Sequence, residues 1–115
     1  MEQLLNPCRR DIVLVPFPFS DQSGSKRRPA LIVSSDKFNA KSEDVVALAI
    51  TSFCDGEPYE IAIKAEDWKD GLYSESYVKA WAIGAIDKGL VIKRIGRLAP
   101  ARYEEAVGKM REIIG

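Results

Sequence analysis

The chain has 115 residues, with 17 basic and 17 acidic side chains, a formal net charge of zero and a hydrophobic fraction of 46%. These values are typical of one globular domain, expected here over residues 1–115, and they exclude disordered, collagen-like and membrane-spanning proteins. Because no secretory signal is recognisable and two cysteines cannot form a disulfide framework, we expect a cytoplasmic protein with free thiols.

The first half of the chain contains three predicted strands. Residues 11–16 are apolar and rich in β-branched side chains, and the prolines at 16 and 18 remove two backbone donors, so this strand should end at about Phe17. Residues 20–24 have the Ser, Asp and Gly content of a loop. Residues 30–34 and 45–50 are nearly continuous apolar runs, which predict the central strands of a sheet.

The second half predicts two surface strands and one helix. Residues 59–64 and 76–81 alternate between apolar and polar side chains, as half-exposed strands do. Further on, the apolar side chains fall on one helical stripe with Pro100 at a suitable first position, although Ala99 is a poor N-cap. The stripe consists of Tyr103, Ala106, Val107, Met110, Ile113 and Ile114. We therefore expect a mainly β fold, a small curved antiparallel sheet or partial barrel with one C-terminal amphipathic helix.

Charge is unevenly distributed along the chain. Residues 43–70 carry eight acids and two lysines, whereas residues 79–111 carry eight bases and three acids. A basic face would form if Arg9, Arg10, Lys26, Arg27 and Arg28 folded beside the second half. The alternative is a surface of evenly mixed charge.

The available chemistry is narrowed by the absence of histidine, which excludes histidine-dependent hydrolysis. The sequence has no glycine-rich phosphate loop and no metal-ligand spacing, so we expect neither a cofactor nor a metal site. Arg28 precedes Pro29, which favours an extended backbone leading into a buried strand. A guanidinium fits the charge of a pentacoordinate phosphate, and the hydroxyl of Thr51, at the end of another strand, could contact a phosphate oxygen. The alternative is that neither residue has a functional role, with Arg28 a surface arginine before a strand and Thr51 an ordinary strand residue.

These segments together resemble the PemK/MazF toxin endoribonucleases of type II toxin-antitoxin systems. The segment DIVLVPFPFSDQSGSKRRPALIVSS is similar to that family's first block, and DVVALAITS is similar to its second. Four short segments are similar to its third block: Gly71-Leu72, Ser76-Tyr77-Val78-Lys79, Ile86-Asp87-Lys88 and Ile95-Gly96-Arg97-Leu98. The resemblance runs over nearly the whole chain.

The resemblance implies an SH3-like curved sheet that works as a homodimer, with single-stranded RNA such as mRNA in the dimer groove. Arg28 would be the catalytic arginine and Thr51 the catalytic hydroxyl residue. The substrate's 2′-hydroxyl would attack without a metal, giving a 2′,3′-cyclic phosphate and a 5′-hydroxyl. Because a guanidinium stays protonated, stabilisation of the phosphate is a firmer role for Arg28 than proton transfer. The residues expected to bind RNA are Ser20, Lys26, Arg27, Ser52, Lys79 and Trp81.

The same resemblance implies a small cognate antitoxin as partner, with an acidic or amphipathic segment that covers the groove, and no membrane partner. One segment departs from the family pattern, because residues 79–85 lack the polar pair that many members use to hold RNA. Within it, Trp81 either stacks on a base or belongs to the core. Two other functions stay open: a CcdB-like toxin that binds gyrase through its C-terminal helix, and an inactive relative that only binds RNA.

Overall fold

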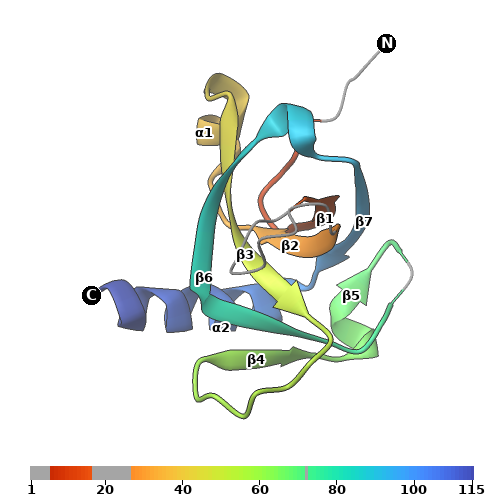
Figure 1. Cartoon of the computed structure of the whole chain (residues 1–115), viewed down its shortest axis with the longest axis vertical. Coiled ribbons are helices and arrows are strands. Elements are labelled where there is room, and N and C mark those ends of the chain that lie inside the picture. Colours follow the sequence, from red (N-terminus) through yellow and green to blue (C-terminus); the bar gives the residue numbers. More distant parts are fainter. Residues whose placement is uncertain (1–5, 17–26, 72) are drawn as a thin grey trace.

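The structure, a computed structural model, describes residues 6–16, 27–71 and 73–115, and over these residues seven strands form one antiparallel sheet. The order across the sheet is β4-β6-β3-β2-β1-β7-β5, and the sheet curls into a nearly closed barrel (Figure 1). The strands are β1 (Asp11–Val15), β2 (Arg28–Ile32), β3 (Asp44–Thr51), β4 (Glu60–Ile63), β5 (Trp68–Lys69), β6 (Ser76–Asp87) and β7 (Lys93–Leu98). Two α-helices, α1 (Asp36–Lys41) and α2 (Pro100–Ile114), and two 3-10 turns, η1 (Ala65–Asp67) and η2 (Lys88–Leu90), complete the described part.

The predicted fold class is confirmed: the protein is mainly β with a C-terminal helix. The two continuous apolar runs became β2 and β3 at the middle of the sheet, and the two alternating segments became the edge strand β4 and its neighbour β6. Several boundaries differ by one or two residues, and one differs by more. Strand β2 begins at Arg28, two residues earlier than expected, and β6 continues to Asp87.

Three elements were not predicted. Helix α1 is only six residues long, too short for an apolar period, and begins where Ser35 Oγ accepts a hydrogen bond from Phe38 N at 3.1 Å. Strand β7 carries three basic residues and a glycine, which hides its alternation, and β5 has two residues. All three lie outside the strong apolar segments from which strands and helices are predicted.

A bulge shapes the longest strand, β6. Leu48 of β3 pairs with Ile83, but the next residue, Ala49, pairs with Lys79, so the register shifts across residues 80–82. Extra residues on one strand bend it and increase its twist. The bend divides β6 in two: its first part pairs with both β3 and β4, and its second part continues along β3 (Figure 1).

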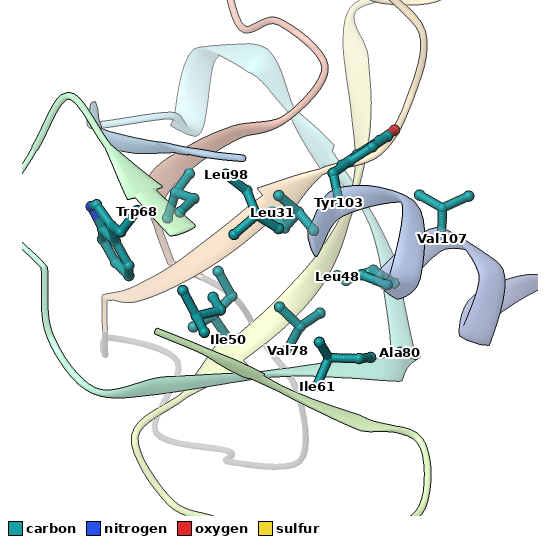
Figure 2. Close-up of a cluster of buried hydrophobic side chains, with 13 residues drawn as sticks. Leu31, Leu48, Ile50, Ile61, Trp68, Val78, Ala80, Leu98, Tyr103 and Val107 are labelled. Carbon is teal, nitrogen blue, oxygen red and sulfur yellow. The ribbon is translucent and has the colours of Figure 1, made fainter. Parts of the chain in front are cut away.

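Buried side chains form two clusters, one on each face of the central strands. The larger cluster joins the sheet to α2 and includes Leu31, Leu48, Ile50, Val78 and Tyr103 (Figure 2). The smaller cluster contains Val13, Val15, Ala30, Ile32, Val45, Ala47, Ile86 and Val91. Residues 30–32 and 47–50 are buried throughout, which explains why these strands have no polar alternation.

Helix α2 has no side-chain cap at Ala99 and has Pro100 in its first turn, as expected from the sequence. Tyr103, Ala106 and Val107 are buried, but the predicted stripe is only partly covered, because Ile113 and Ile114 are 38% and 65% exposed. In the described ranges, no helix is long and apolar enough to cross a membrane.

Candidate active site

Four neighbouring strands place the candidate residues in one row. Val15 of β1 pairs with Arg28, and Thr51 of β3 pairs with Tyr77 of β6. The β2–β3 register pairs Ala30 with Ala49, and continuing it by two residues sets Arg28 opposite Thr51. Directly paired residues of antiparallel strands share a face and lie about 5 Å apart. We call Val15, Arg28, Thr51 and Tyr77 the Arg28 row.

Arg28 and Thr51 both line an open hollow of about 330 Å³ at the ends of their strands. Both side chains are partly exposed, so they can meet a ligand while their backbones belong to the sheet. The residues that line the hollow are Arg27, Arg28, Pro29, Ile50, Thr51, Ser52, Trp68, Ser74, Ser76 and Ile95. The structure therefore brings together four of the residues singled out in the sequence: Arg27, Arg28, Thr51 and Ser52.

Thr51 is the last residue of β3 and also the first residue of the turn that leads to β4. Its Oγ1 accepts a hydrogen bond from Phe53 N at 3.1 Å. A hydroxyl has one donor hydrogen and two lone pairs, so this bond fixes the oxygen and leaves the hydrogen able to donate. The arrangement suits the contact with a phosphate oxygen that was expected of Thr51.

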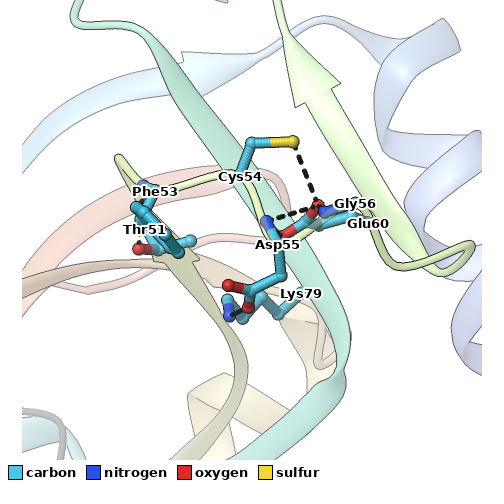
Figure 3. A network of polar contacts seen from close by, with 7 residues as sticks. All are labelled: Thr51, Phe53, Cys54, Asp55, Gly56, Glu60 and Lys79. Carbon is cyan, nitrogen blue, oxygen red and sulfur yellow. Dashed lines mark hydrogen bonds and ion pairs between the residues drawn. The ribbon is translucent and has the colours of Figure 1, made fainter.

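The turn after Thr51 is organised by the carboxylate of Glu60 (Figure 3). Glu60 Oε2 accepts from Asp55 N at 2.9 Å and Oε1 from Gly56 N at 3.0 Å, while Cys54 Sγ lies 3.4 Å from Oε1. Gly56 has φ +76°, a conformation that side chains disfavour. These contacts hold the turn in one conformation although its side chains face solvent.

Lys79 does not line the hollow, and it has two partners of its own. Its Nζ forms an ion pair with Asp55 Oδ2 of the turn and lies 5.3 Å from the centroid of the Trp81 ring. Lys79 is on the same face as the Arg28 row, two residues further along β6 than Tyr77. The ion pair links the turn to β6, and any ligand that bound Lys79 would have to compete with Asp55.

Trp81 lies in the bulge of β6 and is 39% exposed, outside both buried clusters. Of the two alternatives, the structure therefore favours a surface residue over a core residue. An exposed indole beside a lysine can stack on a flat ring.

Two aromatic residues near Thr51 were not singled out from the sequence. Tyr77 is paired with Thr51 in the Arg28 row, and its Oη donates to Glu75 Oε2 at 3.1 Å, a hydrogen bond that raises the pKa of Tyr77. Phe53 is 69% exposed on the turn. The alternation of Tyr77, Lys79 and Trp81 along β6 could have predicted a shared face, whereas no sequence signal predicted the orientation of Phe53.

Arg9 and Arg10 lie beside the second half of the chain, as the basic-face hypothesis required, but not beside Arg28. Arg10 lies at the opposite end of β1, where its Nη1 donates to Leu98 O at 2.9 Å, and the Arg9 guanidinium lies 5.7 Å from the Tyr103 ring centroid. Five residues of extended chain, roughly 16 Å, separate Arg10 from the residue paired with Arg28. The basic residues are thus split between two ends of the sheet.

Two expected RNA-binding residues, Ser20 and Lys26, and the predicted end of the first strand at Phe17 lie outside the described residues. Within residues 6–16, 27–71 and 73–115, no group of three or more acidic or cysteine side chains is arranged to hold a metal ion.

Comparisons with known proteins agree with one another. Residues 8–114 match the model of the family described as PemK-like, MazF-like toxin of type II toxin-antitoxin system. The endoribonuclease toxin MazF of Escherichia coli K12 is 28% identical over 106 residues, which cover 89% of this chain and 95% of MazF. A mycobacterial endoribonuclease solved in complex with its cognate antitoxin superposes with a TM-score of 0.79 at 25% identity, covering 95% of each chain. MazF from Deinococcus radiodurans superposes with a TM-score of 0.82 at 23% identity, covering 97% of this chain and 99% of that one.

Proposed function

Because the chain belongs to the PemK-like, MazF-like toxin family of type II toxin-antitoxin systems, we propose that it is an endoribonuclease that cleaves single-stranded RNA such as mRNA in a sequence-dependent manner. The observation that carries the proposal is that Arg28 and Thr51, at the ends of the adjacent strands β2 and β3, line the same open hollow. A guanidinium and a hydroxyl about one strand spacing apart can bind two oxygens of one phosphate.

In the proposed reaction, the 2′-oxygen of the substrate attacks the adjacent phosphorus and loses its proton, while the bond from phosphorus to the 5′-oxygen breaks. The departing 5′-oxygen takes up a proton, so the products carry a 2′,3′-cyclic phosphate and a 5′-hydroxyl. The reaction needs no external nucleophile and, in this proposal, no metal. Negative charge grows on the phosphate oxygens in the transition state, and Arg28 stabilises it.

The other residues around the hollow have supporting roles in this proposal. Thr51 donates its hydroxyl hydrogen to one phosphate oxygen, while the hydrogen bond from Phe53 N holds Thr51 Oγ1 in place. Arg27 and Ser52 line the same hollow and bind neighbouring phosphates. Lys79 and Trp81 bind RNA further along the same face, and Ser20 and Lys26 complete the expected set.

We also propose a cognate antitoxin, a homodimer and a cytoplasmic location. The mycobacterial relative solved with its cognate antitoxin supports the antitoxin partner. An antitoxin segment that covers the hollow would block Arg28 and Thr51 together, which is a simple means of inhibition. In this proposal residues 1–115 form one domain, and two such protomers form the dimer. Sedimentation of the purified chain tests the dimer.

The test is incubation of the purified chain with single-stranded RNA in EDTA, followed by mapping of the 5′ ends. We expect Arg28→Ala to lower kcat by at least about 100-fold, as loss of a donor to a transition-state oxyanion does. Arg28→Lys should restore only part of the rate, because a point charge cannot bind two oxygens side by side. A 2′-deoxy nucleotide at the cleavage position should stop cleavage without preventing binding.

Arg111→Ala on the exposed surface of α2 is the matched control, since it removes an arginine outside the hollow. Undiminished cleavage by Arg28→Ala, or cleavage of the 2′-deoxy substrate, would refute the proposed mechanism. Cell toxicity that survives Arg28→Ala but disappears when α2 is shortened would instead indicate the gyrase-binding alternative, and RNA binding without any product would indicate an inactive relative.

A further inference from the structure

Phe53 is the most exposed of the large hydrophobic side chains that the described ranges leave at the surface. It projects from the turn between β3 and β4 and belongs to neither buried cluster. Single exposed rings are common on protein surfaces, so a functional role for Phe53 has to be argued from its position and not from its exposure alone. Because the turn could have carried a polar residue here without loss of core packing, the ring is not needed for folding.

The ring is presented by a braced turn. Phe53 N donates to Thr51 Oγ1 at 3.1 Å, and beyond it the Glu60 carboxylate accepts from two backbone amides of the same turn. Asp55, two residues after Phe53, is paired with Lys79 of β6 (Figure 3). An aromatic platform held in this way loses little conformational entropy when a flat ligand stacks on it.

The position of Phe53 indicates which ligand it meets. Thr51, two residues earlier, and Ser52, one residue earlier, both line the hollow with Arg28. Two residues span at most about 7 Å, so the ring starts within one nucleotide of a phosphate bound at Thr51. Two acids close to it in sequence have partners, since Asp55 pairs with Lys79 and Glu60 accepts from backbone amides. Aromatic side chains beside phosphate-binding residues are typical of single-strand binding sites.

We propose that Phe53 is a specificity-determining residue, a stacking platform for the base next to the scissile phosphate. The proposal rests on the endoribonuclease function proposed above. Every base has a π-face, so the platform accepts all four bases and adds a modest preference that is set by their stacking strength. The hydrogen bond to Thr51 Oγ1 couples the platform to the reacting phosphate, because the same turn sets the position of both groups.

The experiment compares Phe53→Ala, Phe53→Leu and Phe53→Tyr with the unmodified protein, on the RNA sequence that 5′-end mapping identifies. Binding is measured with an RNA that carries a 2′-deoxy nucleotide at the cleavage position, and kcat/KM with the cleavable RNA. We expect Phe53→Ala and Phe53→Leu to lose about 5- to 100-fold in both, and Phe53→Tyr to stay within about threefold, since its ring still stacks.

A second series replaces each nucleotide around the cut, one at a time, with an abasic nucleotide. If Phe53 stacks on one base, Phe53→Ala should cause no further loss of binding or cleavage on the RNA that lacks that base. On RNAs with the abasic nucleotide at any other position, Phe53→Ala should cause its full loss. Phe38→Ala, which removes an exposed phenylalanine from α1, is the matched control and should match the unmodified protein on every RNA. The thermal midpoint of each variant shows that it is folded.

The possible outcomes separate this inference from the function on which it rests. If the unmodified protein neither binds nor cleaves RNA, both are refuted. If it cleaves and Phe53→Ala cleaves and binds equally well, only the platform is refuted. The platform is also refuted if the loss is the same at every abasic position, or if Phe53→Ala weakens only the affinity for the antitoxin.

Discussion

Gly96→Ala should destabilise the fold by crowding Trp68. Gly96 is in β7, and a Cβ atom built on it would lie 2.1 Å from Trp68 Nε1 and 2.7 Å from Cδ1. Trp68 is only 6% exposed, and its Nε1 donates to Ile95 O at 3.0 Å. The ring can escape the clash only by moving away from β7, which gives up that hydrogen bond and part of its packing in the core. Overpacking with a lost buried hydrogen bond costs about 2–4 kcal/mol.

For a domain of this size about 1 kcal/mol corresponds to roughly 4 °C, so the thermal midpoint should fall by about 8–16 °C. Calorimetry or urea unfolding measures the change. Gly108→Ala in α2 is the matched control, because its Cβ would meet nothing within 4 Å and should raise stability by about 0.5–1 kcal/mol. A fall of less than about 4 °C for Gly96→Ala, or no recovery when Trp68→Phe is added, would contradict the reasoning. Because Trp68 and Ile95 line the hollow, RNA cleavage should also decrease.

Two further predictions concern ion pairs. Asp55→Asn should release Lys79 from its ion pair, so that Lys79 can bind an RNA phosphate. RNA binding should tighten about two- to fivefold, and the slope of log K against log salt concentration should become steeper by about 0.7. Unchanged affinity in a salt titration would contradict a role for Lys79. Asp67 is partly buried, which would raise its pKa, but the hydrogen bonds from Lys64 N and Arg102 Nε prevail and lower it from the ordinary 3.8. The stabilisation is therefore present above pH 3.8 and is lost as the pH falls through the lowered value. Asp67→Asn should cost about 1–2 kcal/mol at pH 7 and progressively less as the pH falls below 3.8, measured by urea unfolding; a difference independent of pH would contradict this reasoning.

The sequence predicted the strands whose apolar pattern is strong. Ala47 to Ile50 and the segment after Pro29 are continuously apolar because both of their faces are buried, and such a run is visible in the sequence. Strand β7 was missed because its neighbours in space, β1 and β5, come from distant parts of the chain and determine its pairing. A six-residue helix such as α1 depends on the Ser35 cap, a local signal that is weak by itself.

For the candidate site, the residue types were predictable and their spatial relations were not. Arg28 and Thr51 were singled out separately, and only the folded structure brings them to the same hollow, at the ends of the neighbouring strands β2 and β3. Trp81 lies at the register shift across residues 80–82 and is 39% exposed, and the residue type alone does not decide between surface and core. The separation of Arg9 and Arg10 from Arg28 likewise follows from the direction of β1.

The Arg28 row also has an evolutionary consequence. Neighbouring residues of a strand point to opposite faces, so a single-residue insertion or deletion within β2 or β3 would turn Arg28 or Thr51 towards the wrong face. A two-residue change would keep the face but move one partner a full pair along its neighbour. We therefore expect natural homologues to differ in the lengths of their loops. The number of residues from Arg28 to Ile32 and from Ala47 to Thr51 should stay constant, and an alignment of homologues can test this pattern.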